Sequence, residues 1–127
     1  MLHELLAAYL ERVERTIQEC RQVYVEHYAE EVLTPERINL RLRLRFEQGH
    51  MLEISEAVVI ENDSLVSLDY RYHCQDASNR LVFRYDCTPH FPELENFPHH
   101  KHVPNRVMPS PKPDIEEAIG EAKQIEP

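Results

Sequence analysis

Apolar residues in the first part of the chain recur with the spacing of a helix. Steps of three or four residues place the following side chains on one stripe: Leu2, Leu6, Tyr9, Val13, Ile17, Cys20, Tyr24 and Tyr28. Thr34-Pro35 ends the pattern, because proline lacks an N–H and disfavours helical backbone in the residue before it. The stripe predicts helical structure over residues 1–34. A helix of this length is unusual in a globular domain, so we expect a break between Gln18 and Val23.

The period changes to two residues after Pro35. In residues 38–46 the apolar side chains occupy every even position, which is typical of a half-buried strand. Gln48-Gly49 predicts a hairpin turn, and further strands separated by polar turns are expected at residues 51–60, 65–75 and 81–86. The predicted fold is α+β: a four-stranded antiparallel meander over residues 37–87, with its apolar face covered by the long N-terminal helix.

Proline dominates the chain after Thr88, at positions 89, 92, 98, 104, 109, 111 and 113. Because proline cannot donate to a sheet, residues 88–113 are predicted to form an extended arm on the surface. Asp114 is a suitable N-cap, which predicts a short helix over residues 114–123. With 127 residues, the chain fits a single domain, residues 1–127.

Composition limits the possible classes of function. Hydrophobic residues make up 42% of the chain and charged residues 29%, as in ordinary globular proteins. The net charge of −9 argues against a protein that coats nucleic acid through a general basic surface. Residues 37–87 carry a net charge of only −1, with seven arginines as the cations, so this segment is the best candidate for holding an anion.

The chain shows neither a membrane segment nor an export signal. No stretch approaches the roughly 18 apolar residues that span a bilayer, and the N-terminus lacks a basic region before its apolar residues. We therefore expect a bacterial-type cytoplasmic location and no membrane partner. Cys20, Cys74 and Cys87 are odd in number and lack CxxC spacing, which predicts free thiols in a reducing compartment.

The first candidate site is a stripe of arginines on the strand at residues 38–46. Arg41, Arg43 and Arg45 would lie on one face about 6.5–7 Å apart, which approximates the spacing of successive phosphates. The arginine fork suits phosphate oxygens. The alternative is a solvated strand face neutralised by Glu53, Asp69 or the acidic helix.

The second candidate site lies on the next two strands of the meander. Strand alternation places these side chains on one face: Asp69, Arg71, His73, Arg84 and Asp86. Imidazole, carboxylate and guanidinium groups together suit general acid–base cleavage of a phosphodiester. A cross-strand ladder of salt bridges without catalysis is the alternative. The tyrosines Tyr70, Tyr72 and Tyr85 either fill the core or stack on bases.

The third candidate site is a cluster of histidines between prolines: His90, His99, His100 and His102, with Lys101. Metal binding is one interpretation, although the spacing matches no strong zinc motif and carboxylate or thiolate partners would have to come from elsewhere. General-acid or phosphate-binding work is a second interpretation. In the third, the imidazoles only bond backbone carbonyls. We predict no metal ligand and no cofactor.

The run from Tyr70 to Pro104, YRYHCQDASNRLVFRYDCTPHFPELENFPHHKHVP, resembles the TumE-like family of toxins from bacterial type II toxin–antitoxin modules. The strings LRLRLRF, EISEAVVI and VMPSP are similar as well, so the resemblance extends over residues 38–113. Cys74 and Cys87 stand where that pattern has a tyrosine and an asparagine. The resemblance implies a growth-inhibiting protein that a cognate, DNA-binding antitoxin neutralises.

The leading hypothesis is a toxin that acts as a metal-independent endoribonuclease with RNA as its substrate. Acid and base would come from His73 with His99, His100 and His102, and Asp86 would orient a histidine. Phosphate would be held by the arginines at positions 41, 43, 45, 71 and 84, with further substrate contacts from Tyr70, Tyr72, Tyr85, His90 and Lys101. The alternatives are a non-catalytic interaction module and a histidine-rich metal-binding protein. A homodimer through the tyrosine-bearing stripe of the N-terminal helix is also considered.

Overall fold

The first helix of the computed structural model, which describes residues 1–125, follows the predicted stripe but ends early. Helix α1 spans Glu4–Glu19 and buries Leu6, Leu10 and Val13, which are three or four residues apart. The Nδ1 atom of His3 caps it by accepting a hydrogen bond from the Leu5 N–H at 3.1 Å. Cys20 has extended backbone angles, so the helix ends inside the predicted break.

The prediction of helix over residues 20–34 is wrong. Strand β1, Val23–Thr34, occupies this stretch and pairs antiparallel with β2, Arg37–Phe46. Gln22, with a φ of 61°, turns the chain between α1 and β1. The tyrosines at positions 24 and 28 suit a helical stripe, but valine and tyrosine also favour strands, and pairing with β2 decides the outcome.

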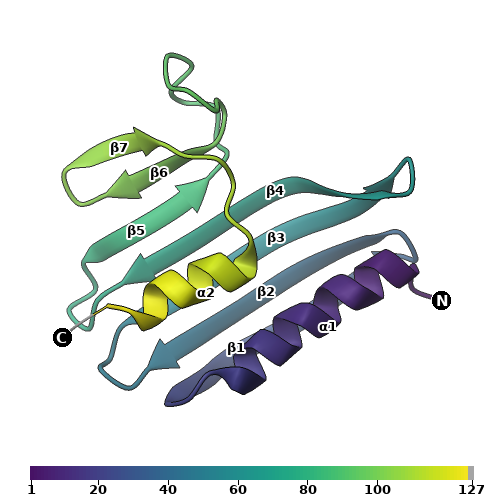
Figure 1. Cartoon of the computed structure of the whole chain (residues 1–127), viewed down its shortest axis with the longest axis horizontal. Helices are drawn as coiled ribbons and strands as arrows, with labels where there is room; N and C mark the ends of the chain where they lie inside the picture. Colours follow the sequence, from purple (N-terminus) through teal and green to yellow (C-terminus); the bar gives the residue numbers. More distant parts are fainter. Residues whose placement is uncertain (126–127) are drawn as a thin grey trace.

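The described residues form a seven-stranded antiparallel sheet in sequential order, β1 to β7, instead of the four strands expected (Figure 1). The predicted meander is present as β2, β3 (Met51–Glu61), β4 (Ser64–Gln75) and β5 (Leu81–Asp86). Asn62 and Asp63 both have positive φ, as a two-residue hairpin turn requires. The alternation of apolar residues therefore located these four strands correctly.

The prediction of a surface arm over residues 88–113 is wrong in part. Strands β6, His100–Val103, and β7, Arg106–Pro109, form a hairpin that extends the sheet beyond β5. Pro98 and Pro104 flank β6 and Pro109 ends β7, so no proline interrupts the ladder between β5 and β6. The predicted terminal helix is confirmed as α2, Ile115–Lys123, with Asp114 and Glu117 forming a capping box.

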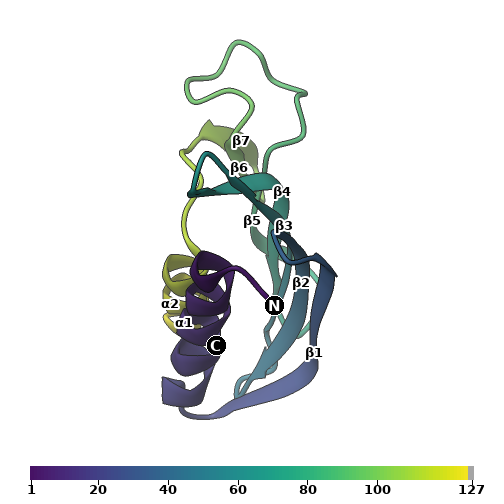
Figure 2. The ribbon, with the colours of Figure 1, turned by 90° about the vertical axis from the view of Figure 1, so that its right-hand side faces the viewer.

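The molecule has two layers, because α1 and α2 lie on the same side of the sheet (Figure 2). We call this side the covered face and the other side the open face. The even-numbered residues of β2 and β3, together with Phe83 and Tyr85 of β5, are buried on the covered face. The odd-numbered arginines of β2 project from the open face. No helix among residues 1–125 is long and apolar enough to cross a membrane.

Candidate functional site on the open face

Strand pairing arranges polar side chains of the open face in two rows that cross the sheet. In one row Arg71 is opposite Asp86, which is opposite His100. In the neighbouring row His73 is opposite Arg84, which is opposite His102. The predicted grouping of β4 and β5 residues on one face is thus confirmed, and β6 adds two histidines because the chain folds back along β5.

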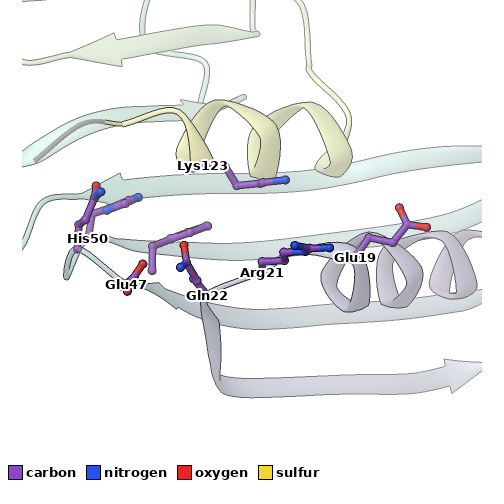
Figure 3. A pocket seen from close by; sticks show the side chains of 8 residues that line it. Glu19, Arg21, Gln22, Glu47, His50 and Lys123 are labelled. Carbon is purple, nitrogen blue, oxygen red and sulfur yellow. The ribbon is translucent and has the colours of Figure 1, made fainter.

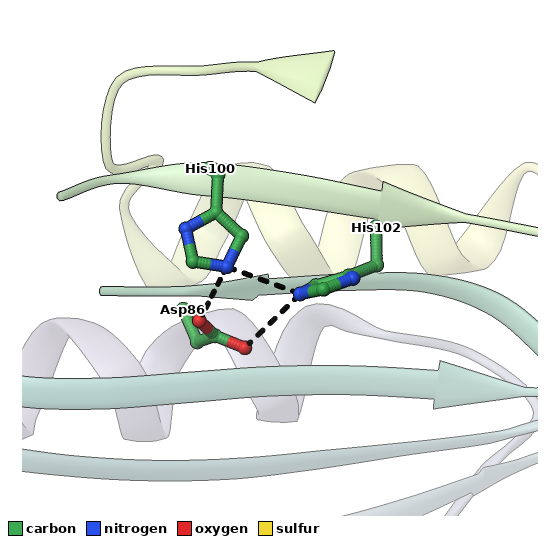
Figure 4. A group of neighbouring side chains, drawn as sticks. All are labelled: Asp86, His100 and His102. Atoms are coloured by element: carbon green, nitrogen blue, oxygen red, sulfur yellow. Dashed lines mark hydrogen bonds and ion pairs between the residues drawn. The ribbon is translucent and has the colours of Figure 1, made fainter. Parts of the chain in front are cut away.

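Asp86, His100 and His102 form the tightest cluster of these rows (Figure 4). The Nε2 atom of His100 lies 2.8 Å from Oδ1 of Asp86 and 3.0 Å from Nε2 of His102. The Nε2 atom of His102 lies 3.7 Å from Oδ2 of Asp86. Asp86 and His100 are buried, whereas His102 is partly exposed. Burial, followed by the positive charge of Arg84, lowers the pKa of His102 below its ordinary value.

The hydrogen bonds of His100 determine which of its ring nitrogens carries a proton. The Nδ1 atom of His100 lies 2.9 Å from the carbonyl oxygen of Pro98, so Nδ1 carries the proton and donates it. A neutral His100 would then turn the lone pair of Nε2 toward the Asp86 carboxylate. Two acceptors facing each other at 2.8 Å are repulsive, so a proton or another cation has to lie among the three groups.

A hollow of about 250 Å³ opens next to this cluster and is lined by Arg71, Arg84, Asp86, Thr88, His90 and His102. The Nε atom of Arg84 lies 3.5 Å from Oδ2 of Asp86, which is within ion-pair distance, but it is buried without a hydrogen-bond partner among the described residues. His90 reaches the hollow from the loop between β5 and β6. The arrangement therefore combines two guanidinium groups with two imidazoles in one concave place.

A second hollow, of about 650 Å³, continues across the open face toward β1, and Arg71 lines both. Of the predicted arginine stripe, Arg43 is paired with Glu53 at 2.6 Å and Arg45 with Glu26 at 3.1 Å. Arg41 lines the larger hollow and has no ion pair within residues 1–125. Two arginines of the predicted stripe are thus neutralised by glutamates, and Arg41 is the one available to bind an anion.

Several predicted substrate contacts lie on the covered face, away from these hollows. Tyr70, Tyr72 and Tyr85 are buried in the core, where they fit the core-filling interpretation. Lys101 pairs with Glu121 of α2 at 2.7 Å and lies over the Tyr85 ring. The Nδ1 atom of His99 lies 2.9 Å from the Tyr70 hydroxyl oxygen, so His99 is also separated from His100 and His102.

His73 is on the open face but does not line either hollow. Its Nε2 atom lies 2.9 Å from Oε1 of Gln75, and its Nδ1 atom is buried without a hydrogen-bond partner in the part of the chain that is described. Its Cα partners are Glu53 on β3 and Arg84 on β5. The structure thus brings His73 next to the cluster rather than into it, and its catalytic role stays a prediction.

A polar cluster on the covered face, centred on Glu56, was not predicted from the sequence. This carboxylate accepts hydrogen bonds from the Tyr9 hydroxyl at 3.0 Å and the Ser67 hydroxyl at 2.7 Å. It also pairs with Lys112 at 3.0 Å, and the Tyr72 hydroxyl donates to it. Its charge raises the pKa of Tyr72 further, in addition to the larger effect of burial. One signal was available: Glu56 stands at an even, apolar position of the strand pattern.

A third hollow, of about 410 Å³, lies at the other end of the molecule, between the ends of α1 and α2 and the turn after β2 (Figure 3). It is lined by Glu19, Arg21, Gln22, Phe46, Glu47, Gln48, His50 and Lys123. His50 has a structural role there, because its ring stacks on Phe46 and its Nε2 atom lies 2.8 Å from the Ala122 carbonyl oxygen, to which it donates a hydrogen bond. None of the predicted site residues lies there, so the open face remains the candidate site.

The predicted free thiols are confirmed at all three cysteines. Cys74 is buried in the core, which raises its pKa to about 12, so it is poorly suited to act as a nucleophile. Cys87 lies at the end of β5 with its Sγ atom 3.4 Å from Asp69, and burial raises its pKa as well. Thiol chemistry is therefore not a feature of the candidate site.

Comparison with known proteins gives one result that bears on function. The family model described as Toxin TumE matches residues 13–126. No curated protein and no solved structure matches the chain. The matched range includes every residue of the candidate site.

Proposed function

The chain belongs to the TumE toxin family, and from this premise we propose that it is the toxin of a bacterial type II toxin–antitoxin module and acts as a metal-independent endoribonuclease. Family membership implies a cognate antitoxin as partner. The observation that supports the ribonuclease activity is the convergence of Asp86, His100 and His102 beside a hollow that Arg71 and Arg84 also line.

His102 is the general base in this proposal. Its Nε2 side faces Asp86 and His100, and its other ring nitrogen points away from the carboxylate (Figure 4). Asp86 and His100 hold the proton on the Nε2 side, which leaves the Nδ1 lone pair free to accept a proton from substrate. The lowered pKa of His102 keeps the imidazole neutral near pH 7, as a base requires.

The proposed reaction is a transesterification within the RNA chain. His102 accepts the proton of the ribose 2′-hydroxyl while O2′ attacks the adjacent phosphorus and the bond from phosphorus to O5′ breaks. His90, as the imidazolium, donates a proton to the leaving O5′. The products are a 2′,3′-cyclic phosphate and a 5′-hydroxyl end. Arg71 and Arg84 stabilise the charge that develops on the phosphoryl oxygens.

The test compares purified wild-type protein with His102→Gln in an RNA cleavage assay that contains EDTA. We expect cleavage by the wild type and a rate lower by about 10² or more in the variant, because a positioned acid or base contributes roughly 10²–10⁴. His3→Asn is the matched control and should cleave as the wild type does, because residue 3 lies outside both hollows and asparagine can still cap α1. Product ends that lack a cyclic phosphate would contradict the proposed reaction.

Two further results decide between the histidines and between the hypotheses. Loss of cleavage in His73→Gln with full activity in His102→Gln would move the site along the same row, from β6 across Arg84 to His73 on β4. The second result concerns the wild-type protein. Growth arrest that the neighbouring reading frame relieves, without any RNA cleavage by the purified protein, would overturn the ribonuclease proposal.

A non-catalytic interaction module is the second candidate, and one observation favours it. The edge strand β1 exposes Tyr24, Val25, Val32 and Leu33, with unpaired backbone along its outer side. This candidate predicts growth arrest by His102→Gln that equals wild type, and loss of arrest when Val32 is changed to lysine. The ribonuclease proposal predicts the opposite result for His102→Gln.

A further inference from the structure

We propose that Asp86, His100 and His102 bind one divalent transition-metal ion, and that binding of Zn²⁺ switches off RNA cleavage. The binding site stands on geometry alone, whereas the inhibition rests on the proposed ribonuclease function. From the sequence we predicted no metal ligand, because the histidine spacing matches no strong zinc motif and carboxylate or thiolate partners would have to come from elsewhere. Asp86, opposite His100 in the β5–β6 ladder, supplies that carboxylate.

The donor atoms lie close enough together to converge on a tetrahedral zinc ion. Bonds of roughly 2.0–2.1 Å to zinc place neighbouring donors about 3.3–3.4 Å apart in a tetrahedron. The Nε2 atom of His100 lies 2.8 Å from Oδ1 of Asp86 and 3.0 Å from Nε2 of His102, which in turn lies 3.7 Å from the other carboxylate oxygen, Oδ2. One donor atom from each residue lies within 4.8 Å of the other two, so changes of the side-chain angles, including a turn of the carboxylate, would bring one imidazole nitrogen from each histidine and one carboxylate oxygen to bonding distance.

The hydrogen bonds around the cluster orient these donors as metal ligands are usually oriented. A histidine that binds metal through Nε2 generally donates its Nδ1–H to a carbonyl or carboxylate, and His100 does so to Pro98 at 2.9 Å. The backbone N–H of Thr88 donates to Oδ1 of Asp86 at 3.2 Å. The same geometry leaves lone pairs facing one another unless a cation lies between them, and a divalent ion satisfies all three at once.

The surroundings of the three donors determine whether a coordination position stays free and how tightly a metal ion is bound. Three protein donors leave a fourth position of a tetrahedral ion free, as in zinc sites that keep an exchangeable ligand. The Phe91 ring packs against His100 with its centroid 5.2 Å away, and the hollow borders the other two donors, Asp86 and His102. Arg84, at 3.5 Å from Asp86, repels a cation, so we expect micromolar rather than nanomolar affinity.

Metal binding would remove the general base. A zinc ion on Nε2 of a neutral imidazole leaves the ring proton on Nδ1. His102 would then present an N–H to the substrate instead of a lone pair, and it could no longer accept the 2′-hydroxyl proton. Proton and metal thus compete for one place, and the metal-bound form is inactive.

The binding test is calorimetric titration of Zn²⁺ into untagged full-length protein that has been freed of metal. We expect one ion per chain, with binding weakened at least tenfold in His102→Ala and in Asp86→Asn, and unchanged in His27→Ala on β1. Two variants are used so that a folding defect in one does not decide the result, and circular dichroism checks each fold. Binding that persists in both site variants, or no binding by the wild type, would overturn the site.

The inhibition test adds Zn²⁺ to the cleavage assay and then removes it with EDTA. We expect reversible loss of at least nine-tenths of the activity at the concentration that saturates the calorimetric site. Zinc binding without any cleavage in EDTA would refute the ribonuclease function and leave the metal site intact. Cleavage that zinc leaves unchanged or increases would refute the inhibition, whatever the titration shows.

Discussion

Two buried carboxylates lie on opposite faces of the same sheet, and their surroundings differ. Glu56, 3% exposed, lies on the covered face and accepts hydrogen bonds from three hydroxyl groups in addition to its ion pair with Lys112. Asp86, 8% exposed, lies on the open face between two imidazoles, with Arg84 at the edge of ion-pair distance. The first cluster satisfies its polar atoms, whereas the second leaves the Nε atom of Arg84 buried without a hydrogen-bond partner among the described residues.

This difference indicates which cluster holds structure and which is available for chemistry. A buried carboxylate whose partners are all donors has no reason to take up anything further, and it fastens the elements that supply those donors. Glu56 joins Tyr9 of α1 and Lys112, which precedes α2, to the sheet. The cluster at Asp86 instead borders a hollow, and two imidazoles and Arg84 share its carboxylate, as is typical of sites that exchange protons or ions.

The largest expected effect concerns the covered face. Glu56→Ala leaves Lys112 and the hydroxyl groups of Tyr9 and Tyr72 without their shared acceptor, so unfolding free energy should fall by roughly 3–5 kcal/mol. Urea denaturation followed by circular dichroism measures this loss. Glu53→Ala is the control on the same strand, because Glu53 pairs on the open face with a half-exposed arginine. An unfolding midpoint of Glu56→Ala close to that of Glu53→Ala would contradict the structural role.

Asp86→Asn should lower stability less than Glu56→Ala does and should lower activity instead. The amide keeps the shape of the carboxylate and can still accept from Thr88, so we expect stability to fall by about 1–2 kcal/mol. The rate of RNA cleavage should fall by about 10², equivalent to roughly 2.7 kcal/mol, because the proton on Nε2 of His102 loses the carboxylate that holds it.

The kinetic constants separate this positioning role from a folding defect. With the binding arginines intact, Asp86→Asn should lower kcat and leave KM near its wild-type value. If the variant were merely less folded, the loss of activity would match the fraction of unfolded protein, and activity would return at lower temperature. An unchanged kcat would show that Asp86 does not act through His102.

Strands β2 to β5 could be predicted because a half-buried strand alternates apolar and polar residues along its own sequence. The start of α1 was predictable from its apolar stripe, and that of α2 from its N-cap, Asp114. In β2 the even positions are buried without exception from Ile38 to Phe46, so the pattern has one solution. Strand β1 escaped prediction because it is an edge strand whose side chains are mostly exposed, and exposure removes the alternation that identifies a strand. Strand β6 escaped because the prolines around it suggested that the whole segment lies outside the sheet.

The candidate site was predictable where it depends on strand parity and unpredictable where it depends on long-range register. Parity placed Arg71, Arg84 and Asp86 on one face. The histidines belonged to a segment whose pairing was not foreseen, so neither the separation of His99 from His100 nor the contact of His100 with Asp86 followed from the sequence. The tyrosines were assigned to two alternatives, and packing beneath the helices decides for the core.

The smallest expected effect compares two arginines that are two residues apart on β2. Arg43 is already paired with Glu53, whereas Arg41 has no ion pair within residues 1–125 and lines the larger hollow. RNA binding to an inactive His102→Gln background should therefore depend on Arg41 more than on Arg43. Each phosphate contact to a single strand contributes about 0.7 to the slope of log affinity against log salt. Arg41→Gln should reduce the slope by about that amount, and Arg43→Gln should leave it unchanged. Equal slopes for the two variants would mean that Glu53 releases Arg43 when RNA binds, and the pairing on the open face would then not select the binding residues.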